Sequence, residues 1–309
     1  MRTVFLGTSA FAAALLTRLV GERGQPDSYA PALVLTRPDR PAGRGRKLGA
    51  PPVAETARAL GLALAQPESV NEPAVRELIA DIAPDAVIVC AFGALVKEPL
   101  LSDYEMLNVH PSLLPRWRGA APIERAIMAG DERTGVSIMR LTAGLDSGPV
   151  CLLASEPIHA DDTFGSLAGR LERVGGDLLL SALWTLDRGE PLAFAEQDEG
   201  QITYAEKIVA ADRLLDPKRP AVELERVVRA LSPHVGTRVA LSDGTQLGVR
   251  RAALGTPPAS DGGEGVHARD GRLLLDCVEG ALELIEVQPP GKRPMPAEAF
   301  LRGHGLKSP

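Results

Sequence analysis

Asn108 and His110 are the first residues of this sequence whose types and spacing point to chemistry. They lie two positions apart in the apolar segment MLNVH. Side chains two positions apart on an extended strand point to the same face, so an amide and an imidazole would converge. An amide donates hydrogen bonds without titrating, and an imidazole moves a proton or stabilises negative charge. The pair suits a carbonyl group that becomes tetrahedral; a purely structural histidine at a strand end is the alternative.

Asp146 is the carboxylate that would complete such a site. It follows the apolar segment GVSIMRL and lies between two glycines in GLDSG. The chain between His110 and Asp146 is long enough for one helix and one strand of a βαβ unit, so neighbouring strands would bring the two side chains together. A carboxylate beside an imidazole favours the charged imidazolium. The alternative is that Asp146 only closes an Asx turn.

A basic segment, TRPDRPAGRGRKLG, follows the second predicted strand. Its positive charges, set against the single negative charge of Asp39, are Arg37, Arg40, Arg44, Arg46 and Lys47. Open α/β sheets bind ligands beyond the carboxyl ends of their strands, and glycines let a backbone bend toward a ligand. We interpret the segment as a loop that binds a polyanion; a solvated, flexible loop is the alternative.

The elements that must position these residues alternate along the first half of the chain. Segments such as TVFLG, PALVLT and DAVIVC are nearly continuous in apolar residues, and helical patterns such as SAFAAALLTRLV separate them. This alternation predicts an α/β fold, with a mainly parallel, Rossmann-like sheet covered by helices on both faces. We expect this domain to span residues 1–187.

The first strand and turn, FLGTSAF, limit the choice of cofactor. Gly7 is the single glycine where a dinucleotide site has three, which argues against a nicotinamide or flavin cofactor. Thr8 or Ser9 would cap the next helix, whose N-terminus could face a ligand. A basic residue before an apolar run also resembles a secretory signal, but we favour strand, turn and helix because Gly7, Thr8 and Ser9 interrupt the run.

The sequence changes character near residue 188. Residues 188–203 are polar and without periodicity, which predicts a linker. Residues 204–309 begin with a helical pattern, PAVELERVVRAL, and continue with short β segments, two of them joined at Asp243–Gly244, a hairpin signal. Closely spaced short strands predict a small barrel, and PPASDGGEG predicts a loop tip.

Composition is that of a globular protein: 309 residues, 45% hydrophobic, 24% charged, with a net charge of −6. The negative charge argues against bulk nucleic-acid binding but allows a local basic site. Three distant cysteines offer neither a disulfide framework nor a CxxC metal site, and the five histidines have no metal-ligand spacing. No apolar run reaches the roughly 18 residues of a membrane span. We therefore expect a cytoplasmic protein without a metal.

Several longer motifs resemble one enzyme family. NVHPSLLPRWRGAAPIERAI together with GLDSGPV is similar to the formyltransferases that use 10-formyltetrahydrofolate. TRPDRPAGRGRKL, TYAEK and LIEVQPPGKRPM narrow the resemblance to the branch that formylates methionyl-tRNA. The resemblance runs from Val4 to about Gly303. The chain departs from the family pattern with GTSAF for GTPDF and SPHVG for NPWPG.

The resemblance implies a role for particular residues. Asn108, His110 and Asp146 match the catalytic trio of the family, and Phe11 matches a position near the methionine side chain. Two longer sets are implied: folate binding by Ser112, Leu113, Leu114 and Pro115, and tRNA binding by Arg40, Arg44, Arg46 and Lys47. The C-terminal part matches an OB-like β-barrel that also grips tRNA.

The implied reaction moves the formyl group of 10-formyltetrahydrofolate, a co-substrate, to the free amino group of methionyl-initiator tRNA for translation initiation, without a metal or an obligate protein partner. The same catalytic core could formylate small amines, such as amino sugars or a purine precursor. It could also hydrolyse formyltetrahydrofolate, and a protein that only binds RNA is a further alternative. The basic loop and the barrel favour tRNA, and the intact trio favours catalysis.

Overall fold

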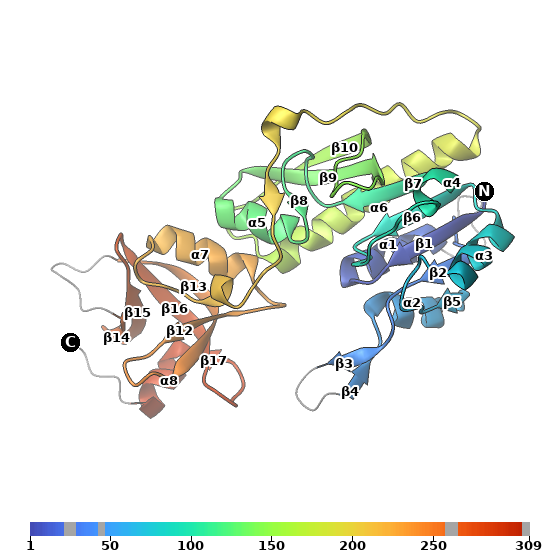
Figure 1. Cartoon of the computed structure of the whole chain (residues 1–309). Coiled ribbons are helices and arrows are strands. Elements are labelled where there is room, and N and C mark those ends of the chain that lie inside the picture. The colour runs from blue at the N-terminus through green and yellow to red at the C-terminus, as the bar shows by residue number, and fades with distance from the viewer. Residues whose placement is uncertain (22–28, 43–46, 257–264, 305–309) are drawn as a thin grey trace. The chain divides into compact units, whose positions relative to one another are not determined.

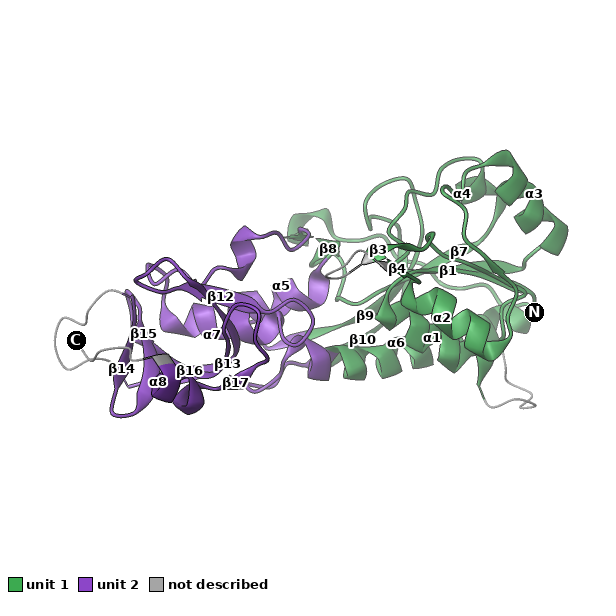
Figure 2. Cartoon of the chain, turned by 90° about the horizontal axis from the view of Figure 1, so that it is seen from below, with its two compact units in different colours: residues 1–120, 134–156, 168–205 green, residues 121–133, 157–167, 206–309 purple. Residues whose placement is uncertain are grey.

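The computed structural model describes residues 1–21, 29–42, 47–256 and 265–304, and the chain forms two compact units (Figure 1). Unit 1 comprises Met1–Ala120, Thr134–Glu156 and Ala168–Ala205, and unit 2 comprises Ala121–Arg133, Pro157–Leu167 and Glu206–Pro309. Figure 2 colours them separately. Each unit is built on one sheet, and the two sheets differ in strand direction.

Unit 1 contains a seven-stranded sheet in the order β10-β9-β7-β6-β1-β2-β5. Its strands are β1 (Thr3–Gly7), β2 (Leu33–Leu35), β5 (Leu64–Ala65), β6 (Ala86–Cys90), β7 (Met106–His110), β9 (Arg133–Arg140) and β10 (Val150–Pro157). The strands from β5 to β7 are parallel, and β1, β6 and β7 are buried along their whole length. Burial on both faces explains their continuous apolar sequences. The predicted Rossmann-like, mainly parallel sheet is confirmed.

Helices cover this sheet. They are α1 (Ala10–Val20), α2 (Pro52–Leu60), α3 (Pro73–Ile82), α4 (Leu100–Asp103) and α6 (Phe164–Asp187), whose first residues lie in unit 2. Figure 2 shows α1, α2 and α6 on one side of the sheet and α3 and α4 on the other.

The Ser9 hydroxyl caps α1 by accepting from the Ala12 amide at 3.2 Å, while the Thr8 hydroxyl donates to the Phe92 carbonyl at 2.7 Å. The N-terminal stretch is thus strand, turn and helix. Among the described residues, no helix is both long and apolar enough to cross a membrane.

The connection from β7 to β9 differs from the expected βαβ unit. β9 pairs antiparallel with β7, with His110 opposite Ser137 and Leu107 opposite Arg140. The C-terminal end of β9 therefore lies beside the start of β7, about 10 Å from His110 at the usual rise per residue. The βαβ expectation was wrong for this pair. Asp146 reaches His110 because the loop between β9 and β10 folds back along β7.

Two smaller pairs of strands complete unit 1. β3 (Arg40–Ala42) and β4 (Lys47–Gly49) form an antiparallel hairpin that projects from the sheet, and β8 (Arg118–Gly119) pairs in parallel with β11 (Tyr204–Ala205). The polar stretch after α6 contains a single 3-10 turn, η1 (Glu199–Gln201). Main-chain hydrogen bonds join Val150 and Ala195, so this stretch is attached to β10.

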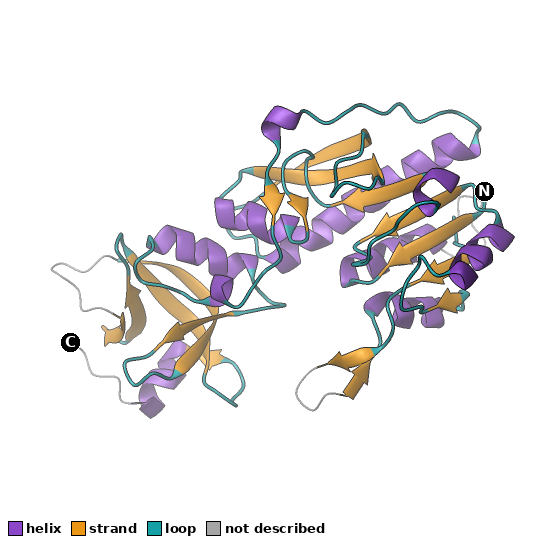
Figure 3. Cartoon of the chain, in the orientation of Figure 1, coloured by secondary structure: helices purple, strands orange, loops and turns teal. Residues whose placement is uncertain are grey.

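Unit 2 is built on an antiparallel sheet in the order β12-β13-β16-β15-β14, with β17 beside β16, visible in orange in Figure 3. Its strands are β12 (Thr237–Ala240), β13 (Gln246–Gly255), β14 (Gly265–Arg269), β15 (Arg272–Asp276), β16 (Ala281–Gln288) and β17 (Met295–Pro296). Its helices are α5 (Pro122–Ala129), η2 (Ala211–Arg213), α7 (Ala221–Ala230) and α8 (Ala297–His304). This is the predicted smaller β domain.

The core of unit 2 forms between α7, α8 and the sheet. Leu224, Val249, Leu282 and Phe300 are among its buried residues. The predicted hairpin at Asp243–Gly244 is confirmed: Gly244 has φ 81°, which favours glycine, and the sequence PPASDGGEG lies almost entirely outside the described residues.

Candidate active site

The structure brings Asn108, His110 and Asp146 together in unit 1. Asn108 and His110 belong to β7 and are 7% and 4% exposed. Nδ2 of Asn108 lies 3.5 Å from Oδ1 of Asp146, and Nδ1 of His110 lies 3.6 Å from Oδ2 of the same carboxylate. These separations are long for hydrogen bonds, so the amide and the imidazole are not locked onto the carboxylate. Catalytic hydrogen bonds are often long without substrate and tighten only when it binds.

His110 also has a partner at its other ring nitrogen. Nε2 lies 2.9 Å from the main-chain oxygen of Trp117, which can only accept a hydrogen bond. The imidazole therefore faces an acceptor oxygen at each nitrogen. A ring with both nitrogens protonated could donate to both oxygens, and to donate to a substrate oxygen instead it would have to give up one of these two contacts.

Asp146 is the residue on which the site converges. In addition to Asn108 and His110, it accepts a hydrogen bond of 2.8 Å from the Gly119 amide to Oδ2. Its φ of 44° is in the left-handed region, which costs an L-residue about 1 kcal/mol and which aspartate tolerates better than most. A residue held in such a conformation needs other contacts to keep it there.

Those contacts come from residues that sequence reasoning missed. Gln197 donates from Nε2 to the main-chain oxygens of Asp146 and Gly148 at 2.9 and 2.7 Å. Its Oε1 accepts from Arg118 at 3.0 and 2.8 Å. Gln197 lies in the stretch predicted as a linker. The nearby motif TYAEK, which contains β11, is the one sequence signal that could have drawn attention to it.

Glycine is required at two positions around this loop. At Gly148 a Cβ would collide with the main-chain oxygen of Arg140, so the loop could not return to β10. Gly119 has φ 124°, and a Cβ there would lie 2.7 Å from the Ala205 oxygen, too close for the pairing of β8 with β11. Both glycines thus permit the backbone approaches that place Asp146.

The segment Ser112–Pro115 follows β7 directly as a tight turn. The Ser112 hydroxyl, which is fully buried, donates to the Arg116 oxygen at 2.6 Å. The Ser137 hydroxyl donates to the Ser112 oxygen at 2.8 Å and accepts from the Leu114 amide at 3.2 Å. Ser112 therefore shapes the turn, while Leu113 and Pro115 are half-buried and present apolar surface.

The remaining predicted residues are distributed over unit 1. Phe11 is buried in the first turn of α1. Arg40 begins β3, and its exposed side chain lies 3.5 Å from Glu68. Arg44 and Arg46 lie outside the described residues, and of Lys47 only the main chain, in β4, is described.

The three cysteines are free thiols. Burial raises the pKa of Cys90, and burial is also the main cause that raises the pKa of Cys151 and of Cys277 to about 11. Thiols with such pKa values are almost fully protonated near neutral pH, which leaves them poor nucleophiles. Within the described ranges, no group of three or more His, Cys, Asp or Glu side chains is arranged to hold a metal ion.

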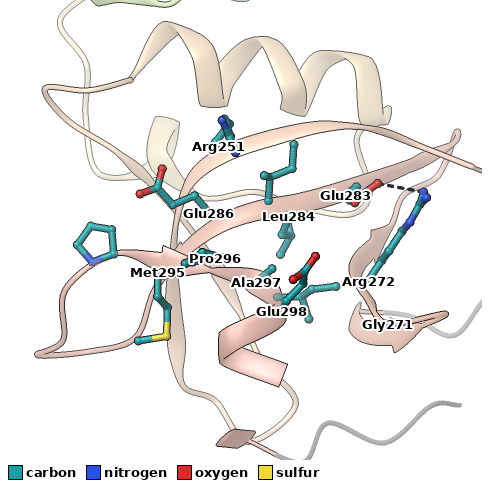
Figure 4. Close-up of a pocket in the computed structure, with 13 residues that line it drawn as sticks. Arg251, Gly271, Arg272, Glu283, Leu284, Glu286, Met295, Pro296, Ala297 and Glu298 are labelled. Atoms are coloured by element: carbon teal, nitrogen blue, oxygen red, sulfur yellow. Dashed lines mark hydrogen bonds and ion pairs between the residues drawn. The ribbon is translucent and has the colours of Figure 1, made fainter. Parts of the chain in front are cut away.

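A hollow of about 730 Å³ lies on unit 2, beside β15, β16 and β17 (Figure 4). Its charged lining comprises Arg251, Arg272, Glu283, Glu286 and Glu298. Arg272 and Glu283 lie 3.4 Å apart across neighbouring strands and form an exposed ion pair, which contributes little to stability. The hollow contains none of the predicted catalytic, folate-binding or tRNA-binding residues, but residues at both ends of the motif LIEVQPPGKRPM line it.

Comparisons with known proteins find formyl transferases along almost the whole chain. The family model described as "Formyl transferase" matches residues 1–183, and "Formyl transferase, C-terminal domain" matches residues 207–305. A curated protein of Methylococcus capsulatus named "Methionyl-tRNA formyltransferase" is 43% identical over 309 residues, covering 99% of this chain and 98% of the relative. One of the same name from Halorhodospira halophila is 41% identical over 307 residues, covering 99% and 97%.

Among solved structures, HypX from Aquifex aeolicus in complex with tetrahydrofolic acid superposes with a TM-score of 0.65 at 18% identity. The match covers 100% of this chain and 48% of HypX. At this identity the likeness concerns the fold alone, whereas the family models and the curated relatives extend along almost the whole chain. The chain therefore belongs to the formyl transferase family.

Proposed function

We propose that this chain transfers the formyl group of 10-formyltetrahydrofolate to the free amino group of methionyl-initiator tRNA. The observation that carries the proposal is the meeting of Asn108, His110 and Asp146 beside β7. Relatives that share about two fifths of the sequence over their whole length carry the name of this activity. The chemistry needs a carbonyl activator and a proton carrier, and these three side chains provide both.

In the proposed mechanism, Asn108 and His110 donate hydrogen bonds to the formyl oxygen as negative charge develops on it. Donors already in place for an oxyanion lower the barrier because they need no reorganisation during the reaction. 10-Formyltetrahydrofolate supplies an activated formyl carbon. The attacking amine must be neutral, and an α-amino group with a pKa of about 7.7–8 supplies this form as a minor fraction near pH 7.

Asp146 and His110 carry the proton. After the amine has added, its nitrogen is positively charged and must lose a proton, and the folate nitrogen must gain one to leave. Asp146 is suited to accept the first proton, because it is a carboxylate only 14% exposed beside the imidazole. Through His110 or a water, the same proton reaches the leaving nitrogen, so no net proton is exchanged with solvent.

The turn Ser112–Pro115 fits the role of a folate contact in one respect. A flat heterocycle can pack on the half-buried Leu113 and Pro115, and turn main-chain groups can hydrogen-bond its edge. The Ser112 hydroxyl already donates to Arg116, so its part is to hold the turn. The substrate specificity of this site thus depends on backbone shape more than on the serine side chain.

For the tRNA we propose two contacts. The basic segment with Arg40, Arg44, Arg46 and Lys47 would contact phosphates near the acceptor end, and residues 204–309, as an OB-like barrel, would hold more of the tRNA. Phe11 would lie near the methionine side chain, and residues 1–187 would carry out the chemistry in the cytoplasm, where translation takes place. Salt-dependent binding is the signature of such phosphate contacts.

One assay separates the alternatives. The protein is incubated with radiolabelled methionyl-tRNA with and without 10-formyltetrahydrofolate, and formylmethionine is released and counted. We expect product only with the folate. Parallel reactions replace tRNA by an amino sugar, by a purine precursor amine or by buffer, and formate release is measured. Formate from buffer alone, or formylation of a small amine without formylation of tRNA, would overturn the proposal.

A further inference from the structure

The Gln197 side chain uses its whole hydrogen-bonding capacity on Arg118 and on the loop between β9 and β10, residues 141–149, here called the catalytic loop. A glutamine amide has two N–H donors and an oxygen with two lone pairs. Both donors reach main-chain oxygens of the loop, at Asp146 and Gly148, and both lone pairs accept from the guanidinium of Arg118. All four distances lie between 2.7 and 3.0 Å, within the range of good hydrogen bonds.

These bonds close a ring around Asp146. From the Asp146 oxygen the ring passes through Gln197 to the side chain of Arg118, along the chain to Gly119, and from its amide back to the Asp146 carboxylate. The hydrogen bond from Gln197 fixes the main chain of Asp146, and the hydrogen bond from Gly119 fixes its side chain. Together they fix both the position and the rotation of the carboxylate.

The ring is itself attached to regular structure on both sides. Two residues before Gln197, Ala195 exchanges both main-chain hydrogen bonds with Val150 of β10, at 2.8 and 2.9 Å. After it, β11 pairs with β8, and Arg118, which is 6% exposed, donates its amide to the Thr203 oxygen at 2.9 Å. The position of Gln197 is therefore set before it contacts the loop.

We propose that Gln197 is a positioning residue for Asp146, and that the stretch 188–205 acts as a strap that holds the catalytic loop in its productive shape. Its hydrogen bonds are made to the loop and to Arg118, so its effect passes through Asp146. The inference rests on the proposed role of Asp146 in formyl transfer. Gln197 would keep Asp146 in place although its backbone is in the left-handed region and glycines lie two positions away on either side.

Gln197→Glu removes the two N–H donors of the side chain and keeps the oxygen that accepts from Arg118. The carboxylate keeps the size of the side chain and still accepts from Arg118, but it cannot donate to the oxygens of Asp146 and Gly148 and repels them. We expect kcat to fall about 10- to 100-fold, because displacing a catalytic group by 1 Å costs about that much. We expect KM for methionyl-tRNA and for 10-formyltetrahydrofolate to change by less than about twofold, since substrate contacts remain.

Gln201→Glu is the matched control. It makes the same chemical change four positions along the same stretch, where the exposed amide donates only to Asp198 among the described contacts. We expect kcat close to that of the parent. An equal loss in both variants would mean that added negative charge, and not the hold on the loop, slows the reaction.

Hydrogen exchange gives a readout that does not depend on catalysis. In Gln197→Glu we expect peptides covering residues 141–149 to exchange several times faster than in the parent, while peptides of β6 and β7 keep their rates. Unchanged exchange in this loop would overturn the inference even if the proposed function stands. If the loop of Gln197→Glu exchanges faster but the parent itself shows no formyl transfer, the result would instead count against the proposed function.

A double-mutant cycle with Asp146→Asn completes the test. If Gln197 acts through Asp146, adding Gln197→Glu to Asp146→Asn changes single-turnover rates by less than about threefold, far less than the loss it causes in the parent. Equal factors in both backgrounds would show that Gln197 acts independently of Asp146, and the inference would fail. Exchange of the loop decides the matter if the double variant turns over too slowly to measure.

Discussion

The main-chain amide of Gly119 donates to Oδ2 of Asp146 at 2.8 Å, and this same oxygen lies 3.6 Å from Nδ1 of His110. A backbone donor holds the carboxylate without competing for protons, because an amide N–H does not titrate in the working range. The oxygen nearest the imidazole is thus fixed in place, and the imidazole is held at its other ring nitrogen by the Trp117 oxygen at 2.9 Å.

Asp146→Asn should retain the loop and lose the reaction. An asparagine oxygen can still accept from Gly119, so the fold is expected to survive, but the negative charge that the proposed mechanism uses to accept the amine proton is gone. We expect kcat to fall at least about 100-fold, the lower range for general acid–base catalysis. Single-turnover formylation with chemically quenched samples measures it, and a loss below about threefold would remove Asp146 from the proton route.

Asn108→Ala should keep stability and lose turnover, because the amide makes only a long contact of 3.5 Å to Asp146 among the described hydrogen bonds and, in the proposed mechanism, donates to the developing oxyanion. Removal of one such donor typically costs about 10²–10³ in kcat. Asn71→Ala is the control, since Asn71 is the only other asparagine in the chain. Its amide bonds Leu95 and Lys97 in the loop before α4, so that variant should lose stability and keep kcat. Equal kcat losses in the two variants would contradict the oxyanion role.

Arg44→Ala should weaken tRNA binding without affecting folate. Each phosphate contact releases roughly 0.7–0.9 counterions, so removing one should raise KM for methionyl-tRNA and flatten its dependence on salt. Arg188→Ala is the control, because Arg188 is half-exposed, pairs with Glu190 and lies over the Trp184 ring. KM values measured at several salt concentrations decide the outcome. The same tRNA KM and slope in parent and variant would assign the tRNA contact to residues 204–309.

Asp212→Asn should destabilise unit 2 in a pH-dependent way. Two hydrogen bonds of 3.0 Å from Arg125, helped by one from the Val209 amide, hold the pKa of Asp212 below its usual value. Because the folded pKa is the lower one, this stabilisation is fully present above the unfolded pKa and disappears as pH falls through the folded pKa. We expect a loss of about 1.5–3 kcal/mol near pH 7, the usual range for hydrogen bonds to charged groups.

Urea unfolding followed at pH 7 and at steps down to pH 3 measures the effect. The difference between Asp212→Asn and the parent should shrink once the pH falls below about 4, where the unfolded aspartate itself is protonated. Glu223→Gln removes the exposed pair with Arg219 and should change little at any pH. A difference that stays constant down to pH 3 would show that the charge of Asp212 is not what stabilises unit 2.

Much of this protein is determined by local sequence. Buried on both faces, β1, β6 and β7 have the continuous apolar sequences that the parallel sheet requires, and Ser9 caps α1 as its position before an apolar helical pattern predicts. The period of two along β7 places Asn108 and His110 on one face. These features depend on residues close together in the chain, where propensity and spacing decide the structure.

The direction of β9, the return of its loop and the hold on Asp146 were decided only by the tertiary structure. No residue near Asp146 in the sequence indicates that β9 pairs antiparallel with β7. Nor does any indicate that Gln197, 51 positions away, donates hydrogen bonds to the loop. The polar, aperiodic sequence of residues 188–203 predicted a linker, because such sequence is typical of linkers. A single amide with four hydrogen bonds needs no periodicity to act: its contacts depend on where distant backbone oxygens and an arginine meet in space, which local pattern does not encode.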